Sequence, residues 1–179
     1  SKYEWVGEKN QIIMGLMSIK GLKKSIVNTI LDSRKSGAFQ SLEDFLFRVK
    51  MDLSDAMALT NAQCFKYLCN KISHRQIAYI VAEFYLNSKN NNQPLHHGPI
   101  TKDLTADEIY RLEVDSFGYP VSVHPLDPYR PVVSKRISFA KDIHKKLGQS
   151  IYLLGVYITR KEAQTNRNES MQFLTLEDE

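Results

Sequence analysis

The stretch of residues 13–31, IMGLMSIKGLKKSIVNTIL, is an apolar run that breaks at Gly21 and resumes at helical spacing. A glycine lets the backbone turn tightly, and a helix after the turn presents free N–H groups at its positive end. The stretch therefore predicts two helices joined by a tight turn, a helix-hairpin-helix, which can hold a phosphodiester without reading a base. The apolar face after the glycine consists of Ile26, Val27, Ile30 and Leu31.

Three lysines crowd the same turn. Lysines near a duplex backbone add an attraction that does not depend on sequence and weakens with salt. A short loop between two core helices with solvated lysines explains the same residues, because a single glycine turn is a weak signal. The candidate DNA-binding residues of this turn are Lys20, Gly21, Leu22, Lys23 and Lys24.

Basic residues are concentrated in the same part of the chain. The 179 residues carry a net charge of +4, and residues 1–50 alone hold 9 Lys and Arg against 5 Asp and Glu. Residues 51–104 have a net charge of +1 and residues 105–179 of −1. The imbalance favours a polyanion partner for the N-terminal part, although an ordinary basic surface has the same composition.

The sequence contains no recognisable catalytic or metal-binding pattern. Cys64 and Cys69 are too far apart for a zinc pair or a redox motif, and we expect buried free thiols. The five histidines do not have metal-ligand spacing, so we expect no metal and no cofactor. No run approaches the length of a membrane span and the first residues lack the apolar core of a signal peptide, so we expect a cytoplasmic protein with no membrane partner.

Helix signals recur after the opening stretch. Ser41 with Asp44 is an N-cap pattern, a shorter helix is expected from Ser54, and Ser73 with Gln76 has capping-box spacing. Helix, turn and helix thus occur twice, which indicates a tandem repeat over residues 11–88. The second turn, residues 61–63, contains no glycine, so its capacity to bind phosphate is doubtful. Residues 1–10 are expected to be a linker from a longer parent chain.

The second half of the chain changes character. Residues 89–147 predict a linker that contains a capped helix from Thr105 and an extended proline-rich connector. From residue 148 onward, β-branched and aromatic runs separated by a polar turn predict strands of a second, cut-short domain. The expected fold is therefore mainly α with a small β part.

Four phrases make a resemblance specific. They occur in the same order and spacing as in the C-terminal part of the bacterial DNA polymerase III alpha subunit, a C-family polymerase. The phrases are GLMSIKGL, GAFQSLEDFLFRV, FGYPVSVHPLDPY and GVYITRKEAQT with MQFLTLEDE. The phrases YPVSVHPL and TRKE look closer to the auxiliary or error-prone alpha-like forms than to the main replicase. The resemblance extends from about residue 11 to the end.

The resemblance implies a tandem helix-hairpin-helix domain that holds duplex DNA, followed by an oligonucleotide-binding (OB) β-barrel, here incomplete, that meets single-stranded template. It also implies a sliding-clamp peptide in the interval that contains Gln93 and Leu95, where histidines replace the usual aromatic pair. A linker that happens to contain glutamine is the alternative. Lys23 stands where the family has a second glycine. The family's catalytic carboxylates precede this region, so the resemblance implies no polymerase activity for this chain by itself.

Aromatic and basic residues mark the predicted strands. Tyr152, Tyr157 and Phe173 are candidate stacking platforms for bases, although strand alternation would place half of such aromatics in a barrel core. The basic candidates for contact with the DNA backbone are Arg160, Lys161 and Arg167.

Three classes of function compete. The first is a non-catalytic, duplex-DNA-binding region of a polymerase that grips phosphates non-specifically. The second is a protein-interaction module that docks the sliding clamp or an accessory subunit, with the hairpins as scaffold. The third, a free-standing enzyme, is the weakest, because the sequence offers no nucleophile, acid–base pair or metal cluster.

Overall fold

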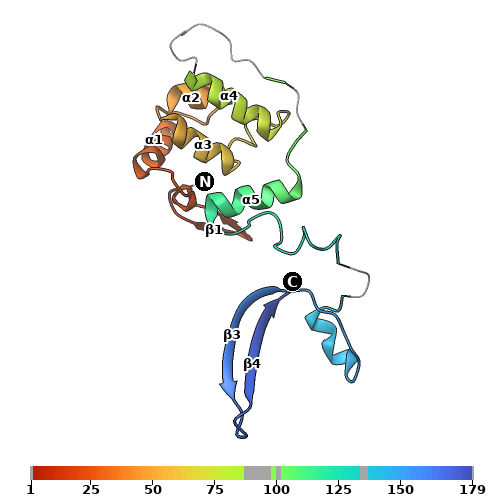
Figure 1. The fold of residues 1–179 in the computed structure, drawn as a ribbon. Coiled ribbons are helices and arrows are strands. Elements are labelled where there is room, and N and C mark those ends of the chain that lie inside the picture. Colours follow the sequence, from red (N-terminus) through yellow and green to blue (C-terminus); the bar gives the residue numbers. More distant parts are fainter. Residues whose placement is uncertain (1, 87–97, 100–101, 134–136, 179) are drawn as a thin grey trace. The chain divides into compact units, whose positions relative to one another are not determined.

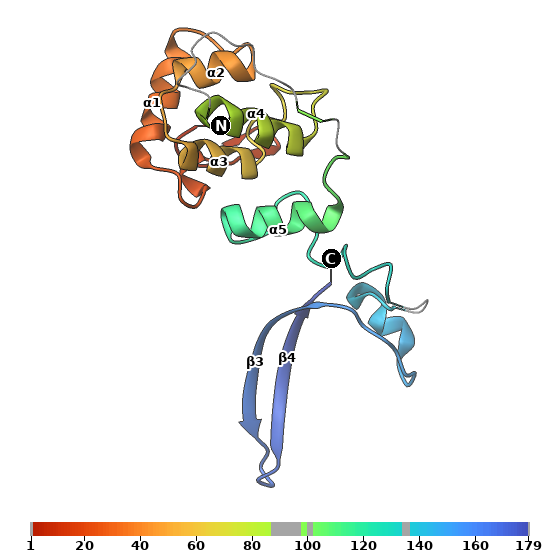
Figure 2. The same cartoon turned by 45° about the horizontal axis from the view of Figure 1, so that its top comes forward.

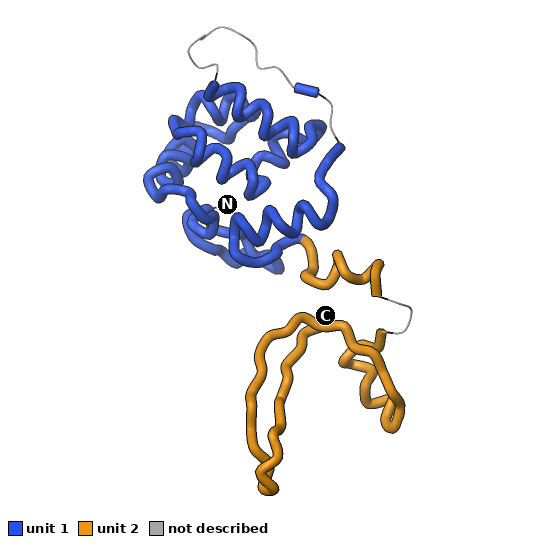
Figure 3. Tube along the Cα trace, in the orientation of Figure 1, with its two compact units in different colours: residues 1–122 blue, residues 123–179 orange. Residues whose placement is uncertain are grey.

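The computed structural model describes residues 2–86, 98–99, 102–133 and 137–178, and the chain is mainly helical with a small β part, as predicted (Figure 1). Its contacts divide it into two compact units, residues 1–122 and 123–179 (Figure 3). The first unit contains β1 (Val6–Glu8), β2 (Gln11–Ile13), the 3₁₀ turn η1 (Leu16–Ser18), α1 (Lys24–Lys35), α2 (Leu42–Arg48), α3 (Leu53–Asn61), α4 (His74–Leu86) and α5 (Ala106–Phe117). The second contains η2 (Ala140–Lys146), β3 (Val156–Gln164) and β4 (Ser170–Glu177).

The segment before the first hairpin turn is more extended than the apolar run predicts. β1 and β2 form an antiparallel hairpin with Val6 opposite Ile13, and only the single turn η1 precedes Gly21. Gly15 explains the change, because a Cβ there would lie 2.5 Å from the carbonyl carbon of Glu4. The missing side chain lets residues 2–4 pass against the chain that leads into η1, where the Leu16 and Met17 amides donate to the Lys2 and Tyr3 carbonyl oxygens.

Local capping signals position the helices that follow. The Ser41 hydroxyl accepts a hydrogen bond from the Asp44 amide at the start of α2, and Thr105 forms a capping box with Glu108 at the start of α5. Ser73 and Gln76 bond reciprocally before α4, as their spacing predicts. α3 begins at Leu53 rather than Ser54, because Asp52 is its N-cap and accepts from the Asp55 amide.

One hydrophobic core holds the first unit together. Phe45 lies at its centre and makes edge-to-face contacts with Phe39 and Phe65, at centroid distances of 4.8 and 5.0 Å. Contacts join α3 to α4 and α3 to α5, and Figure 2 shows these helices as neighbours. The two helix-turn-helix segments therefore share a single core. Its fully buried members include Val27, Ile30, Val49, Leu59, Ile80 and Val81.

The unit boundaries differ from the predicted division. Residues 2–10 and α5, which the sequence assigns to linkers, pack within the first unit. The Lys2 carbonyl oxygen accepts from the Leu16 amide, and the Ser116 carbonyl oxygen accepts from the Lys20 amide. These backbone hydrogen bonds join distant segments, so composition alone does not reveal them. The functional assignment of each range stays a prediction.

The second unit is thinly packed. β3 and β4 form an antiparallel hairpin with Arg160 opposite Leu174, and the polar turn between them lies where the sequence predicts it. Both faces of the hairpin are largely exposed. The proline-rich connector is not extended as expected but folds into successive turns, in which the Tyr129 and Arg130 amides donate to the Leu126 carbonyl oxygen.

Candidate nucleic-acid interface

The first hairpin turn is built around Gly21. Its φ of +79° lies in the left-handed region, where glycine is strongly favoured. Ile19 and Leu22 on either side are buried and fix the turn on the core. Leu22, a candidate DNA-binding residue, is therefore an anchor: its side chain faces inward and its amide donates to the Ile19 carbonyl oxygen.

Free backbone amides cluster beside this glycine. α1 begins at Lys24, and within the described residues the amides of Gly21, Lys24 and Ser25 have no acceptor. The first turn of α1 contains no acidic side chain of its own, but the Asp55 carboxylate accepts from the amide of the N-cap residue Lys23 and offsets part of the positive dipole at this end. This arrangement suits an anion such as a backbone phosphate.

The Lys23 side chain, which the sequence predicts to bind DNA, is already held by two carboxylates of its own chain. Its ammonium contacts the carboxylates of Asp52 and Asp55, and its backbone amide donates to Asp55 Oδ1 at 3.2 Å. The hydrogen bond to Asp52, followed by that to Asp55, raises the pKa of Lys23. Its φ of −71° needs no glycine, which is why lysine is tolerated at this position. Lys23 ties the first hairpin to the start of α3.

Lys20 and Lys24 are exposed and more loosely held. The Lys20 ammonium reaches the Val114 carbonyl oxygen near the C-terminal end of α5 at 3.5 Å, the limit of a hydrogen bond. The Lys24 ammonium lies 5.8 Å from the centre of the Tyr3 ring. Neither ammonium is in an ion pair with a described residue, so both can turn toward a phosphate.

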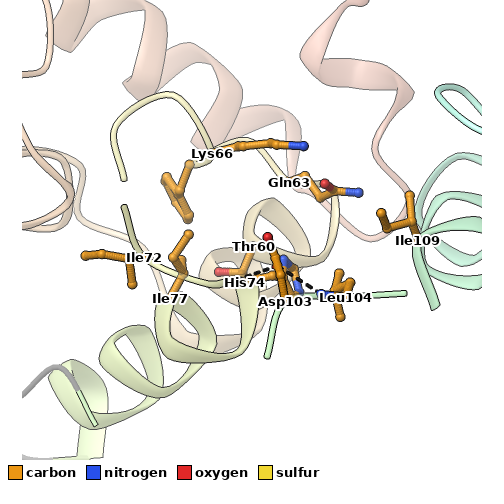
Figure 4. A pocket seen from close by; sticks show the side chains of 10 residues that line it. Thr60, Gln63, Lys66, Ile72, His74, Ile77, Asp103, Leu104 and Ile109 are labelled. Atoms are coloured by element: carbon orange, nitrogen blue, oxygen red, sulfur yellow. Dashed lines mark hydrogen bonds between the residues drawn. The ribbon is translucent and has the colours of Figure 1, made fainter. Parts of the chain in front are cut away.

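The start of α4, the second helix of the second helix-turn-helix segment, already holds a carboxylate from its own chain. The turn at residues 61–63, which contains no glycine, still forms, because Gln63 adopts a left-handed φ of +56°. The Asp103 carboxylate accepts from the amide of His74, the first residue of α4, beside a small pocket of about 40 Å³ (Figure 4). Backbone hydrogen bonds from Leu104 and then His74 lower the pKa of Asp103. A phosphate would meet this carboxylate first.

The candidates on the β3–β4 hairpin fall on two faces. Lys161 lies directly opposite Phe173, whereas Arg160 lies opposite Leu174 on the other face. The bulge after Tyr157 moves this side chain to the face of Leu174 and Arg160. Tyr152 lies before β3, in a bridge to Ile137, and Arg167 lies in the turn. The structure thus joins one aromatic and one basic candidate on each face.

Sequence patterns did not identify the carboxylates of Asp52, Asp55 and Asp103 as part of the site. Asp52 and Asp55 have the spacing of an N-cap pair, a signal that was available, but their link to Lys23 spans about thirty residues. No sequence pattern near Asp103 indicates its contact with the His74 amide, 29 residues away. The clamp-peptide residues Gln93 and Leu95 lie outside the described ranges, so their role stays a prediction.

Other chemistry is sparse in the described ranges. No group of three His, Cys, Asp or Glu side chains there could hold a metal ion. Burial raises the pKa of both free cysteines, Cys64 and Cys69, to about 11, so these thiols stay protonated at neutral pH.

Along the same ranges, no helix combines the length and apolar character needed to cross a membrane.

Comparisons with known proteins agree with this geometry. Residues 1–77 match the model of the helix-hairpin-helix motif. The chain is 28% identical to the DNA polymerase III alpha subunit of Borreliella burgdorferi, with 93% of this chain and 17% of that protein covered. It is 25% identical to the alpha subunits of Treponema pallidum and Aquifex aeolicus, with 93% and 95% of this chain and 16% and 15% of those proteins covered.

The chain therefore spans about a sixth of the length of the curated relatives it matches. The resemblance that the four phrases indicate is confirmed. Residues 1–77 carry a helix-hairpin-helix motif, and nearly the whole chain is similar to a segment of bacterial DNA polymerase III alpha subunits.

Proposed function

We propose that this chain is a non-catalytic, duplex-DNA-binding region of a bacterial alpha-subunit-type DNA polymerase, and that it holds backbone phosphates at the first hairpin. The observation that carries the proposal is that the amides of Gly21, Lys24 and Ser25, at the start of α1, have no acceptor among the described residues. The helix-hairpin-helix match and the polymerase relatives supply the class of ligand. Action on bacterial DNA implies a cytoplasmic location.

The proposal distinguishes the three lysines of the turn. Lys24 and Lys20 provide the cations that accompany the amides, whereas Lys23 positions the turn through Asp52 and Asp55. The second hairpin contributes little to phosphate binding, because Asp103 occupies the first amide of α4. Binding is sequence-independent, since no base-reading side chain is needed.

The finer partners belong to the same proposal. Single-stranded DNA is the proposed ligand of the β3–β4 hairpin as part of an OB-type domain, supported by the exposed pair of Lys161 and Phe173. Docking of a sliding clamp through Gln93 and Leu95 is the alternative function. A pull-down that captures the clamp equally well after Gln93→Ala and Leu95→Ala would remove that peptide from consideration.

The salt dependence of duplex binding tests the proposal. The logarithm of the affinity should fall linearly with the logarithm of salt concentration, because bound phosphates release counterions. Replacing Lys20 and Lys24 together with Ala should reduce the magnitude of the slope by about 2, since each lost phosphate contact contributes about 0.9. Fluorescence anisotropy of a labelled blunt duplex at several salt concentrations measures both quantities.

The matched control removes the same charge elsewhere in the unit. Lys35 and Lys50 are exposed, and neither belongs to the hairpin turn, so their double Ala variant should keep the native slope. Equal loss of slope in the two double variants would mean that only net charge matters. Absence of duplex binding at low salt would refute the proposal outright.

A further inference from the structure

Two aromatic rings meet at the surface of the first unit, next to the first hairpin. The Trp5 and Tyr119 ring centroids are 6.5 Å apart with a 33° tilt, and Phe117 continues the row at 6.4 Å from Tyr119. Trp5 lies before β1 and Tyr119 follows α5, so the fold brings them together from distant segments. Trp5 is 47% exposed and Tyr119 42% exposed, although rings of this size gain most from burial.

The first hairpin is joined to both aromatic segments. The Lys20 amide donates to the Ser116 carbonyl oxygen at 2.8 Å, and the Lys20 ammonium lies against Gly118, the neighbour of Tyr119. On the other side, Lys24 lies over Tyr3, two residues before Trp5. Aromatic and basic side chains therefore alternate around the turn that is proposed to hold duplex phosphates.

The charges of these segments indicate which part of a nucleic acid the rings would meet. Glu8 is paired with Lys2, and Glu113 is buried and accepts from the Val121 and Ser122 amides. The exposed acids Glu4 and Asp115 remain and offset part of the attraction of the lysines. Stacking on a neutral ring face, rather than attraction of phosphates, is then the main contribution that this surface offers.

We propose that Trp5 and Tyr119 form a stacking platform for unpaired bases of single-stranded nucleic acid where it adjoins the duplex at the first hairpin. The inference rests on the proposed function in taking nucleic acid as the ligand. Every base has a π face, so the platform is indifferent to sequence. Trp5 and Tyr119 belong to the first unit, whereas the single-strand contact proposed for the β3–β4 hairpin belongs to the second.

Trp5 provides its own reporter, because it is the sole tryptophan of the chain. Its fluorescence should be quenched by a short oligothymidylate and by a duplex with a single-stranded overhang, but not by the blunt duplex. Quenching by the oligothymidylate should fall less steeply with salt than duplex binding does, since stacking itself releases no counterions. Equal quenching by the blunt duplex would overturn the proposal.

Variants separate the platform from the fold. Tyr119→Leu should weaken overhang binding about tenfold relative to the blunt duplex, whereas Tyr119→Phe, which keeps a ring, should retain it. Phe47→Leu is the matched control, because Phe47 is 70% exposed on α2 of the same unit and contacts only Phe84 among the rings described. An identical effect of Tyr119→Leu and Phe47→Leu contradicts the platform.

The same titrations distinguish the two proposals. If the overhang quenches Trp5 while the blunt duplex fails to bind, the duplex grip is wrong and the platform stands. If the blunt duplex binds and neither the overhang nor the oligothymidylate quenches Trp5, the platform is wrong and the grip stands. Circular dichroism of each variant confirms that the helices are intact.

Discussion

Replacement of Arg48 with Met should lower the free energy of unfolding of the helical unit by about 3 kcal/mol, because several backbone acceptors lose a charged donor together. The guanidinium donates to the carbonyl oxygens of Ser33, Gly37 and Ala38, and it pairs with Asp44. It also lies 4.6 Å from the centre of the Phe39 ring. Arg48 therefore ties the end of α1 to α2. Urea unfolding followed by circular dichroism measures the change.

Lys35→Met is the control for Arg48. Lys35 is a cation in the last turn of α1, which Arg48 contacts from α2, but it is exposed and, among the described residues, pairs only with Asp32 three residues away. Surface pairs of this kind contribute little, so the unfolding midpoint should stay at the native value. Indistinguishable midpoints for the Arg48 and Lys35 variants would show that the hydrogen bonds of Arg48 do not stabilise the unit.

Asp55→Ala should destabilise the unit by about 2 kcal/mol, because Asp55 is completely buried and its carboxylate links two helices. One oxygen accepts from the Lys23 amide at 3.2 Å and the other contacts the Lys23 ammonium at 3.0 Å. Without them, the N-cap of α1 loses its attachment to α3. Thermal unfolding measures the loss, and Asp32→Ala, which removes an exposed carboxylate, should leave the transition unchanged.

The Asp55 variant also tests the role given to Lys23. If Lys23 positions the turn, the folded Asp55→Ala protein should bind duplex more weakly with an unchanged salt slope, because no phosphate contact is lost. A steeper slope would mean that the released Lys23 ammonium contacts phosphate and that Asp55 normally restrains it. That result would contradict the assignment of Lys23 as a purely positioning residue.

Local signals in the sequence predicted much of the fold. The N-caps at Ser41, Ser73 and Thr105 were readable because each cap contacts an amide within a few residues. The turn between β3 and β4 was predictable because polar residues there separate two runs of β-branched and aromatic residues. The single turn η1 was not predictable, because no local pattern shows that the backbone of residues 3–4 passes close to Gly15.

The turn at Gly21 was predictable from the sequence, but the partners of its side chains were not, and its role in binding stays a prediction. Gly21 and its free amides are where the apolar run breaks, as expected. The partners of Lys23 lie about thirty residues away, and Asp103 reaches α4 from beyond an undescribed segment, so no spacing rule could reveal them. The sequence predicts a linker around Trp5, because the contact of Trp5 with Tyr119 depends on the packing of two distant segments.

The most direct test of the account is to follow the backbone amides by NMR while a blunt duplex is added. The account predicts large, saturable shifts of the amide signals of Gly21, Lys24 and Ser25, which have no acceptor within the described residues. The His74 amide, which already donates to Asp103, should shift little. Saturated duplex binding with unshifted signals at Gly21, Lys24 and Ser25 would contradict the account.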